Sequence, residues 1–265
     1  ISSDLAQRAA RLRWIQSLGT GVDSFLQLDR LAKEVIITST RGIHGPQMAE
    51  MALLLMLALS RNFPGMVRNQ DQAVWERRPM ELLQNKQVGI LGLGAVGAEI
   101  ARKCRVFDMT VHGIDLVRKE PAEVDIFYPA ADLRQAVPGL DFFILAAPLT
   151  PLTRKLVDEK TIAAMKPTAF LINLARGEIV DEEALMRALQ SGRIAGAALD
   201  VFSQEPLPKD HPLWKMKNVI ITPHLGGTST TYVAQALPII TENLRRYLAG
   251  KQETLINLIP KSIER

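Results

Sequence analysis

From about residue 86 onward, short apolar runs alternate along the chain with longer amphipathic stretches. The runs are rich in Val, Ile, Leu and Phe, which is typical of strands that are buried on both faces of a sheet. The stretches between them are long enough to be helices, so the alternation predicts an α/β fold with a parallel sheet. The expected strands are 88–91, 110–113, 142–146, 169–173, 195–199 and 219–222, and the expected helices are 95–107, 158–165, 181–191 and 229–249.

The first 45 residues follow a different pattern. Two short apolar runs, at 14–17 and 35–38, predict strands, and residues 18–21 form a turn after the first of them. Two strands are too few for an independent domain, so either they combine with the segment after residue 226 in a second, smaller lobe, or something upstream of them is missing. The predicted organisation is 1–44 and 227–265 for the smaller lobe and 45–226 for the larger domain.

Composition narrows the class of protein. Hydrophobic residues make up 47% of the 265 residues and charged residues 23%, as in ordered globular proteins. The net charge of +4, without a block of Lys or Arg, predicts no nucleic-acid partner. The apolar run 51–59 is far shorter than the roughly 20 residues that span a bilayer, so no membrane partner is expected. Cys104 is the only cysteine, which excludes an internal disulfide, and we expect no metal site.

A glycine-rich turn lies between the first expected strand of the larger domain and its first helix. Gly92, Gly94 and Gly97 form a G-x-G-x-x-G pattern in residues 92–97. The first glycine permits a tight turn, the second lets a pyrophosphate approach the backbone, and the third lets helix and strand pack closely. The pattern predicts a dinucleotide site, and a glycine turn used only for packing is the alternative.

Asp115 follows this turn at the end of the next strand, 18 residues after Gly97. An acidic side chain there can accept hydrogen bonds from ribose hydroxyls and repel a 2′-phosphate, which favours NAD over NADP as the cofactor. Arg118 is a counter-signal, because a nearby Arg can accommodate that phosphate. In the alternative interpretation, Asp115 is only a turn residue.

Three ionisable residues follow three successive expected strands. Arg176, Glu205 and His224 should therefore project toward the edge of the sheet where a dinucleotide binds. An Arg can pair with a substrate carboxylate and polarise its carbonyl, and a His can donate a proton to the carbonyl oxygen. The Glu can hold the imidazole and favour its protonated form. Taken singly, they could be a surface ion-pair partner, a turn residue and a helix-entry residue.

Four stretches in order, 88–97, 173–185, 198–206 and 223–227, resemble the D-isomer-specific 2-hydroxyacid dehydrogenase family. The resemblance implies a Rossmann-type doubly wound parallel sheet as the dinucleotide-binding domain, with a smaller flavodoxin-like substrate lobe. It implies that Arg176, Glu205 and His224 are catalytic. The implied cofactor contacts are Gly92, Gly94, Ala95, Val96, Gly97, Asp115, Ala147, Pro148, Leu174, Ala175, Asp200 and Gly226. The implied substrate contacts are Gly19, Thr20 and Gly21, in a loop over 17–23, together with Arg176 and His224.

The resemblance also implies an NAD-dependent exchange between a 2-keto acid and a D-2-hydroxy acid in a cytoplasmic homodimer. Pyruvate, longer branched keto acids and phosphohydroxypyruvate share the required carboxylate and carbonyl, and glyoxylate or hydroxypyruvate is favoured because no extended polyanion site is evident. Relatives of this kind dimerise through the cofactor domain, near the apolar helix over 48–59 and Trp75. They also have residues before the equivalent of Ile1, so we expect the substrate lobe to be incomplete at its N-terminus. The alternatives are an NADH-sensing corepressor and a formate- or phosphite-type dehydrogenase on the same scaffold.

Several other residues are given structural roles. His44, His112 and His211 match no metal-ligand spacing, and His112 is expected to be packed or satisfied by a neighbour. Cys104 falls within an expected helix and should be buried. Trp214 is expected to pack against its surroundings.

Overall fold

The computed structural model describes residues 3–9, 11–22, 25, 34–118 and 121–260. The chain forms two compact units: Gly45–Gly227 is one, and Ile1–His44 with Thr228–Arg265 is the other. The larger unit is thus a continuous segment inserted into the smaller one. The domain boundaries predicted from the sequence follow residues 44 and 226. The assignment of the smaller unit as the substrate domain, and of the larger unit as the dinucleotide-binding domain, stays a prediction.

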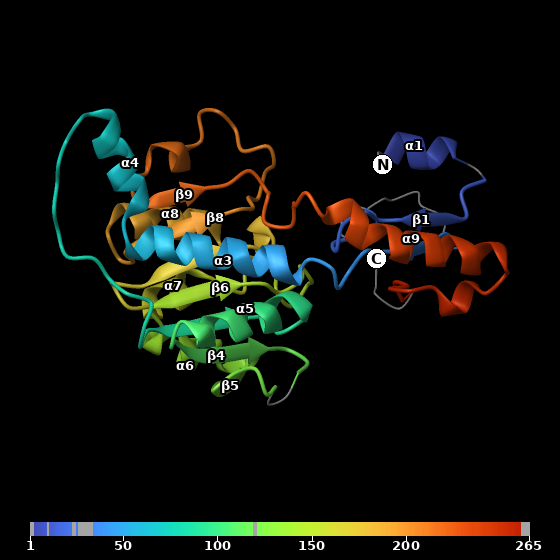
Figure 1. The fold of residues 1–265 in the computed structure, drawn as a ribbon, viewed down its shortest axis with the longest axis horizontal. Coiled ribbons are helices and arrows are strands. Elements are labelled where there is room, and N and C mark those ends of the chain that lie inside the picture. The colour runs from blue at the N-terminus through green and yellow to red at the C-terminus, as the bar shows by residue number, and fades with distance from the viewer. Residues whose placement is uncertain (1–2, 10, 23–24, 26–33, 119–120, 261–265) are drawn as a thin grey trace. The chain divides into compact units, whose positions relative to one another are not determined.

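A seven-stranded sheet forms the centre of the larger unit, and all of its neighbouring strands pair in parallel (Figure 1). Its strands are β3 (Gln87–Leu91), β4 (Thr110–Asp115), β5 (Ile126–Pro129), β6 (Phe142–Leu145), β7 (Phe170–Asn173), β8 (Gly196–Leu199) and β9 (Val219–Ile221). Six of them were expected from the apolar pattern. Strand β5 was not, because it lies at the sheet edge and its residues are only partly buried or exposed.

Helices lie on both faces of this sheet. They are α3 (Gly45–Ser60), α4 (Phe63–Asp71), α5 (Ala95–Val106), α6 (Leu133–Ala136), α7 (Glu159–Ala164) and α8 (Glu182–Gln190). Buried residues of α3 and α5 share one core with the sheet, and those of α6, α7 and α8 share another. In the part of the chain that the structure describes, no helix has both the length and the apolar character to cross a bilayer.

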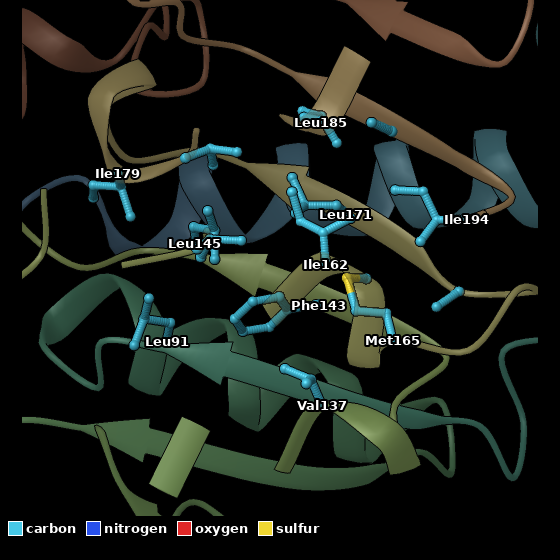
Figure 2. Close-up of a cluster of buried hydrophobic side chains, with 14 of the residues drawn as sticks. Leu91, Val137, Phe143, Leu145, Ile162, Met165, Leu171, Ile179, Leu185 and Ile194 are labelled. Atoms are coloured by element: carbon cyan, nitrogen blue, oxygen red, sulfur yellow. The ribbon is translucent and has the colours of Figure 1, made fainter. Parts of the chain in front are cut away.

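The two cores explain why the strands are continuous apolar runs. Along β6, Phe143 and Leu145 face the core under α6–α8, whereas Phe142 and Ile144 face the core under α3 and α5. Figure 2 shows Phe143 and Leu145 among the side chains of the core under α6–α8. Because successive side chains of a strand point to opposite faces, a central strand in a two-sided sheet has no polar face.

The strand order β5-β4-β3-β6-β7-β8-β9 reverses direction at β3. The chain runs outward from β3 to one edge, then returns to β6 and continues to the other edge. This order is that of a doubly wound Rossmann sheet, which confirms the predicted fold class. In such sheets a ligand binds beyond the carboxyl ends of the strands at the reversal point, here between β3 and β6.

The described part of the smaller unit contains α1 (Ser3–Arg8), the parallel pair β1 (Trp14–Gln16) and β2 (Ile36–Thr38), and the long helix α9 (Tyr232–Leu248). Its two chain segments are joined by specific contacts. Trp14 stacks on Tyr247 with ring centroids 5.0 Å apart, and the fully buried Asn243 donates to Oε1 of Gln16 over 2.9 Å. Described residues of the first segment therefore pack against described residues of the final segment.

Candidate active site

The glycine turn lies at the reversal point of the sheet, and its three glycines meet three different constraints. Gly92 has a φ of +93°, and a Cβ added there would lie 2.5 Å from Cα of Ala147, just after β6. A Cβ on Gly97 would lie 1.9 Å from the carbonyl oxygen of Gly92, so α5 packs directly on the turn. Gly94, by contrast, faces open space with nothing within 4 Å of its added Cβ.

Gly94 is also the N-cap residue of α5, directly before the helix begins at Ala95. The first amides of a helix have no partner within it and point outward, where they can bind phosphate. The space beside Gly94 and the start of α5 therefore fit a pyrophosphate group. Ala95, Val96 and Gly97 form this first turn, and Ala147, two residues after β6, lies beside Gly92.

Asp115 ends β4 beside this turn. Its Oδ2 accepts a hydrogen bond from the amide of Leu93 over 2.6 Å, and Oδ1 accepts from the amides of Val117 and Arg118 over 2.8 and 3.0 Å. Burial alone would raise the pKa of Asp115, but these bonds and the charge of Arg118 outweigh it, so the pKa lies below its ordinary value. The carboxylate is therefore charged and fixed beside the glycine turn. Arg118 itself donates to the carbonyl of Leu93 over 2.7 Å.

His224 and Glu205 form a close pair at the same edge of the sheet. Nδ1 of His224 lies 2.7 Å from Oε2 of Glu205, and the other carboxylate oxygen accepts from the amide of Phe202 over 3.0 Å. An ionised carboxylate only accepts hydrogen bonds, so the proton of this pair resides on Nδ1. The opposite ring nitrogen, Nε2, is then the one that can exchange a proton with a ligand.

The buried carboxylate of Asp200 fixes the segment that carries His224. Its Oδ1 accepts from the hydroxyl of Thr222 and the amide of Leu225 over 2.6 and 2.9 Å, and Oδ2 accepts from the amide of Gly226 over 2.8 Å. His224 has a φ of +53°, an uncommon value for a residue with a side chain. The three bonds to Asp200 hold the chain in this conformation. The cofactor contact of Asp200 stays a prediction, and its anchoring role has no signal in the sequence.

Arg176 follows β7 in a turn that Asn173 closes. The side chain of Asn173 accepts from the amide of Ala175 over 3.0 Å and donates to the carbonyl of Arg176 over 2.9 Å. A Cβ on Gly177 would lie 2.0 Å from the carbonyl carbon of Phe202, so this turn touches the loop after β8 that carries Glu205. The sequence offered one signal for Asn173, namely a polar residue at the end of an apolar run.

The predicted substrate loop lies in the smaller unit. The amide of Gly19 donates to Oγ of Ser17 over 3.2 Å, and the Ser17 hydroxyl is 3.3 Å from the carbonyl of Gly19 and 3.4 Å from that of Gly21. Gly19 therefore uses its amide within the loop. Asp23, at the end of the predicted loop, lies outside the described residues.

Cys104 and His112 are buried, whereas Trp214 is half exposed. Cys104 is fully buried in α5, and burial raises its pKa to about 12, so its thiol stays protonated. His112 is buried with Nε2 2.7 Å from Oε1 of Gln87, and it stacks on Tyr128. Trp214, expected to pack, is half exposed and donates to the carbonyl of Pro208. Within the described residues, no three His, Cys, Asp or Glu side chains are grouped to hold a metal ion.

An all-parallel sheet with a glycine turn at its reversal point defines a dinucleotide-binding α/β protein. The family model for the NAD binding domain of D-isomer specific 2-hydroxyacid dehydrogenases matches residues 53–226. The chain belongs to the D-isomer-specific 2-hydroxyacid dehydrogenase family.

The similarity to individual family members covers nearly the whole of this chain. The D-3-phosphoglycerate dehydrogenase of Methanocaldococcus jannaschii is 34% identical over 97% of this chain, which spans only 50% of that protein. The glyoxylate reductase of Korarchaeum cryptofilum is 32% identical over 95% of this chain and 77% of its own length. The solved NADPH-dependent glyoxylate/hydroxypyruvate reductase of Sinorhizobium meliloti, in complex with NADP and sulfate, aligns with a TM-score of 0.87 at 27% identity, covering 100% of this chain and 84% of its own.

Proposed function

We propose that this protein is an NAD-dependent oxidoreductase that interconverts a 2-keto acid and a D-2-hydroxy acid. The observation that carries the proposal is the 2.7 Å pair of His224 and Glu205, on the sheet edge that also holds the glycine turn. A histidine held by a carboxylate is suited to donate and accept a proton at a carbonyl oxygen. Membership of a dehydrogenase family supports the same reaction class.

Each residue has a distinct role in this proposal. Arg176 pairs with the substrate carboxylate and polarises the adjacent carbonyl. In the smaller unit, the amides of Thr20 and Gly21 are the proposed substrate contacts. His224 delivers a proton to the carbonyl oxygen from Nε2 during reduction and removes it during oxidation, while Glu205 holds the ring through Nδ1. When bound, the nicotinamide supplies or accepts the hydride at the carbon.

The same proposal assigns the cofactor contacts. The glycine turn holds the pyrophosphate and Asp115 holds the adenosine ribose. Ala147 and Pro148 lie on the adenosine side, and Asp200 contacts the nicotinamide amide. Leu174, Ala175 and Gly226 complete the cofactor contacts.

Glyoxylate or hydroxypyruvate is our preferred substrate. Both are small and carry the carboxylate next to a carbonyl that Arg176 is proposed to bind. Two of the proteins similar to this chain are named as reductases of such acids. The phosphoglycerate dehydrogenase relative has twice the length of the matched region, and its substrate is the main competitor.

The experiment that tests the proposal is NADH oxidation against a panel of 2-keto acids, repeated with NADPH. We expect turnover with glyoxylate or hydroxypyruvate, and greater efficiency with NADH. Turnover of formate or phosphite instead, in the direction of NAD reduction, would assign a different donor. NADH binding without turnover of any of these would contradict the proposal and favour an NADH-sensing role.

Replacing Asp115 with serine tests the proposed preference for NAD. The Asp115→Ser variant removes a charged carboxylate that would repel a 2′-phosphate, so kcat/KM should shift toward NADPH by about tenfold, equivalent to about 1.4 kcal/mol. Asp125→Ser is the matched control, because Asp125 also accepts from a backbone amide, that of Val111, over 2.8 Å. Equal use of both cofactors by the unmodified protein would contradict the assignment.

We also propose a homodimer, formed through exposed apolar side chains in and near α3 and α4. Trp75 is 91% exposed, and Leu54, Phe63, Val67 and Val74 are also among the exposed apolar residues of this region. Exposed apolar side chains gathered in one region mark a protein–protein interface. A second copy of the chain would cover them by a self-complementary contact.

A charge at Trp75 should break this dimer. We expect Trp75→Glu to be a monomer in sedimentation velocity at concentrations where the unmodified protein is a dimer, because the interface would bury an unpaired charge. Ile126→Glu is the control, since Ile126 is also an exposed apolar residue, at 42%, and its strand β5 is the edge strand opposite β9. A dimer that survives Trp75→Glu and dissociates with Ile126→Glu would place the interface elsewhere.

A further inference from the structure

A small polar cluster in the smaller unit contacts the predicted substrate loop from one side. Oγ1 of Thr20 lies 2.8 Å from Nδ1 of His44, and Oγ1 of Thr40 donates to the carbonyl of Leu18 over 3.0 Å. Tyr232 completes the cluster: its ring lies 5.7 Å from that of His44, and its hydroxyl is 3.3 Å from Oγ1 of Thr40. We call Thr20, Thr40, His44 and Tyr232 the loop anchor.

The anchor fixes Thr20, in a segment whose Gly19 and Gly21 are also held by Ser17. Thr20 stands between Gly19 and Gly21, and glycine has more backbone conformations to lose than any other residue. Thr20 is itself exposed, yet its hydroxyl reaches His44, of which only 8% is exposed. The contact thus ties an exposed glycine-flanked turn to a buried ring.

The chemistry of His44 suits this role. Burial lowers its pKa from the ordinary value of 6.5, so the ring is neutral at pH 7. A neutral imidazole nitrogen and a hydroxyl can always satisfy each other, because the hydroxyl both donates and accepts. The bond is therefore maintained in either tautomer.

We propose that His44 is a positioning residue that fixes, through Thr20, the loop whose amides bind the substrate carboxylate. This inference rests on the proposed function, which gives the loop its ligand. His44 does not touch the reacting atoms in this proposal. Its effect is to keep the amides of Thr20 and Gly21 in the orientation that a carboxylate requires, so that less ordering is needed when substrate binds.

The test compares kinetic constants of His44→Ala with those of the unmodified protein. We expect KM for the keto acid to rise by about 3- to 10-fold, as for loss of one partly buried hydrogen bond, with a smaller fall in kcat and an unchanged Kd for NADH. His44→Gln retains a side-chain hydrogen-bonding group and should recover most of the loss. His112→Ala is the control, because His112 is equally buried, at 6% exposed, and hydrogen bonds to Gln87 instead of to the loop.

A double substitution shows whether His44 acts through Thr20. If it does, His44→Ala should change KM little further once Thr20→Val has removed the hydroxyl, because the two changes break one contact. Independent, additive effects of the two substitutions would overturn the proposal.

Hydrogen exchange provides a measurement that does not need turnover. Amides of residues 18–22 should exchange faster in His44→Ala than in the unmodified protein or His112→Ala, while those of α9 keep their rates. Unchanged KM and unchanged exchange would overturn the inference, as would faster exchange throughout the smaller unit, which would indicate general destabilisation. If the unmodified protein reduces no keto acid, the proposed function fails, and exchange at 18–22 separately decides whether His44 fixes the loop.

Discussion

Replacing His224 with alanine is expected to lower kcat for keto-acid reduction by about 10²- to 10⁴-fold, the usual contribution of general acid–base catalysis. The variant loses the ring whose Nδ1 lies 2.7 Å from Glu205 and whose Nε2 we assign to proton transfer. NADH binding should be nearly unchanged, because the glycine turn and Asp115 are untouched. Stopped-flow and steady-state measurements of NADH oxidation, with fluorescence titration of NADH, separate the two effects.

His211 offers a matched control for this experiment. It also faces a carboxylate, with Nε2 3.5 Å from Oε1 of Glu182, but it lies in the segment before β9. His211→Ala should leave kcat near that of the unmodified protein. A His224→Ala variant that turns over at a normal rate would remove His224 from the mechanism, whatever its geometry.

Replacing Asp200 with asparagine should have the second large effect, although the side chain changes little in shape. Both oxygens of Asp200 accept hydrogen bonds from donors, and an amide NH₂ in place of either oxygen would face a donor. We expect kcat to fall by at least about tenfold as His224 leaves its position, and the free energy of unfolding to fall by about 1–3 kcal/mol for a broken buried bond. Urea unfolding and turnover report the two quantities.

Asp141 separates the positional effect from a general loss of stability. Asp141 directly precedes β6, so it lies at the amino ends of the strands, whereas His224 lies beyond their carboxyl ends. It accepts a hydrogen bond from the amide of Gln87 over 2.8 Å and one from Lys166 over 2.9 Å. Asp141→Asn should lower stability by a similar amount while kcat stays near normal. If both substitutions lowered kcat equally, Asp200 would have no special part in holding His224.

The sequence predicted the larger unit well because its strands are buried on both faces. A central strand such as β6 has only apolar residues, so its pattern is visible without knowledge of its neighbours. Strand β5 and helix α4 escaped prediction for the opposite reason: β5 contains only exposed or partly buried residues, and α4 has no buried residue. Both elements are also short, so neither provides the fully buried residues by which the central strands and the longer helices were predicted.

Some residues of the candidate site could be proposed from the sequence, whereas others are recognised only in the structure. Arg176, Glu205 and His224 could be proposed from the sequence, because parallel strands place their following residues at one edge. The residues that hold these three in place, Asn173 and Asp200, could not be assigned that role from the sequence. Asn173 and Asp200 act by accepting from, or donating to, backbone groups of the turns beside them, and these partners depend on how each turn is folded. His44 is a further example, since Thr20 lies 24 residues away.

The insertion of the larger unit into the smaller one has a consequence for synthesis on the ribosome. Residues 45–227 can complete their sheet from their own sequence as soon as they have emerged. The strands β1 and β2 must wait, because Trp14 and Gln16 contact Tyr247 and Asn243, which are translated more than two hundred residues later. Residues 14–16 therefore emerge before the larger unit but can complete their packing only after it has been synthesised.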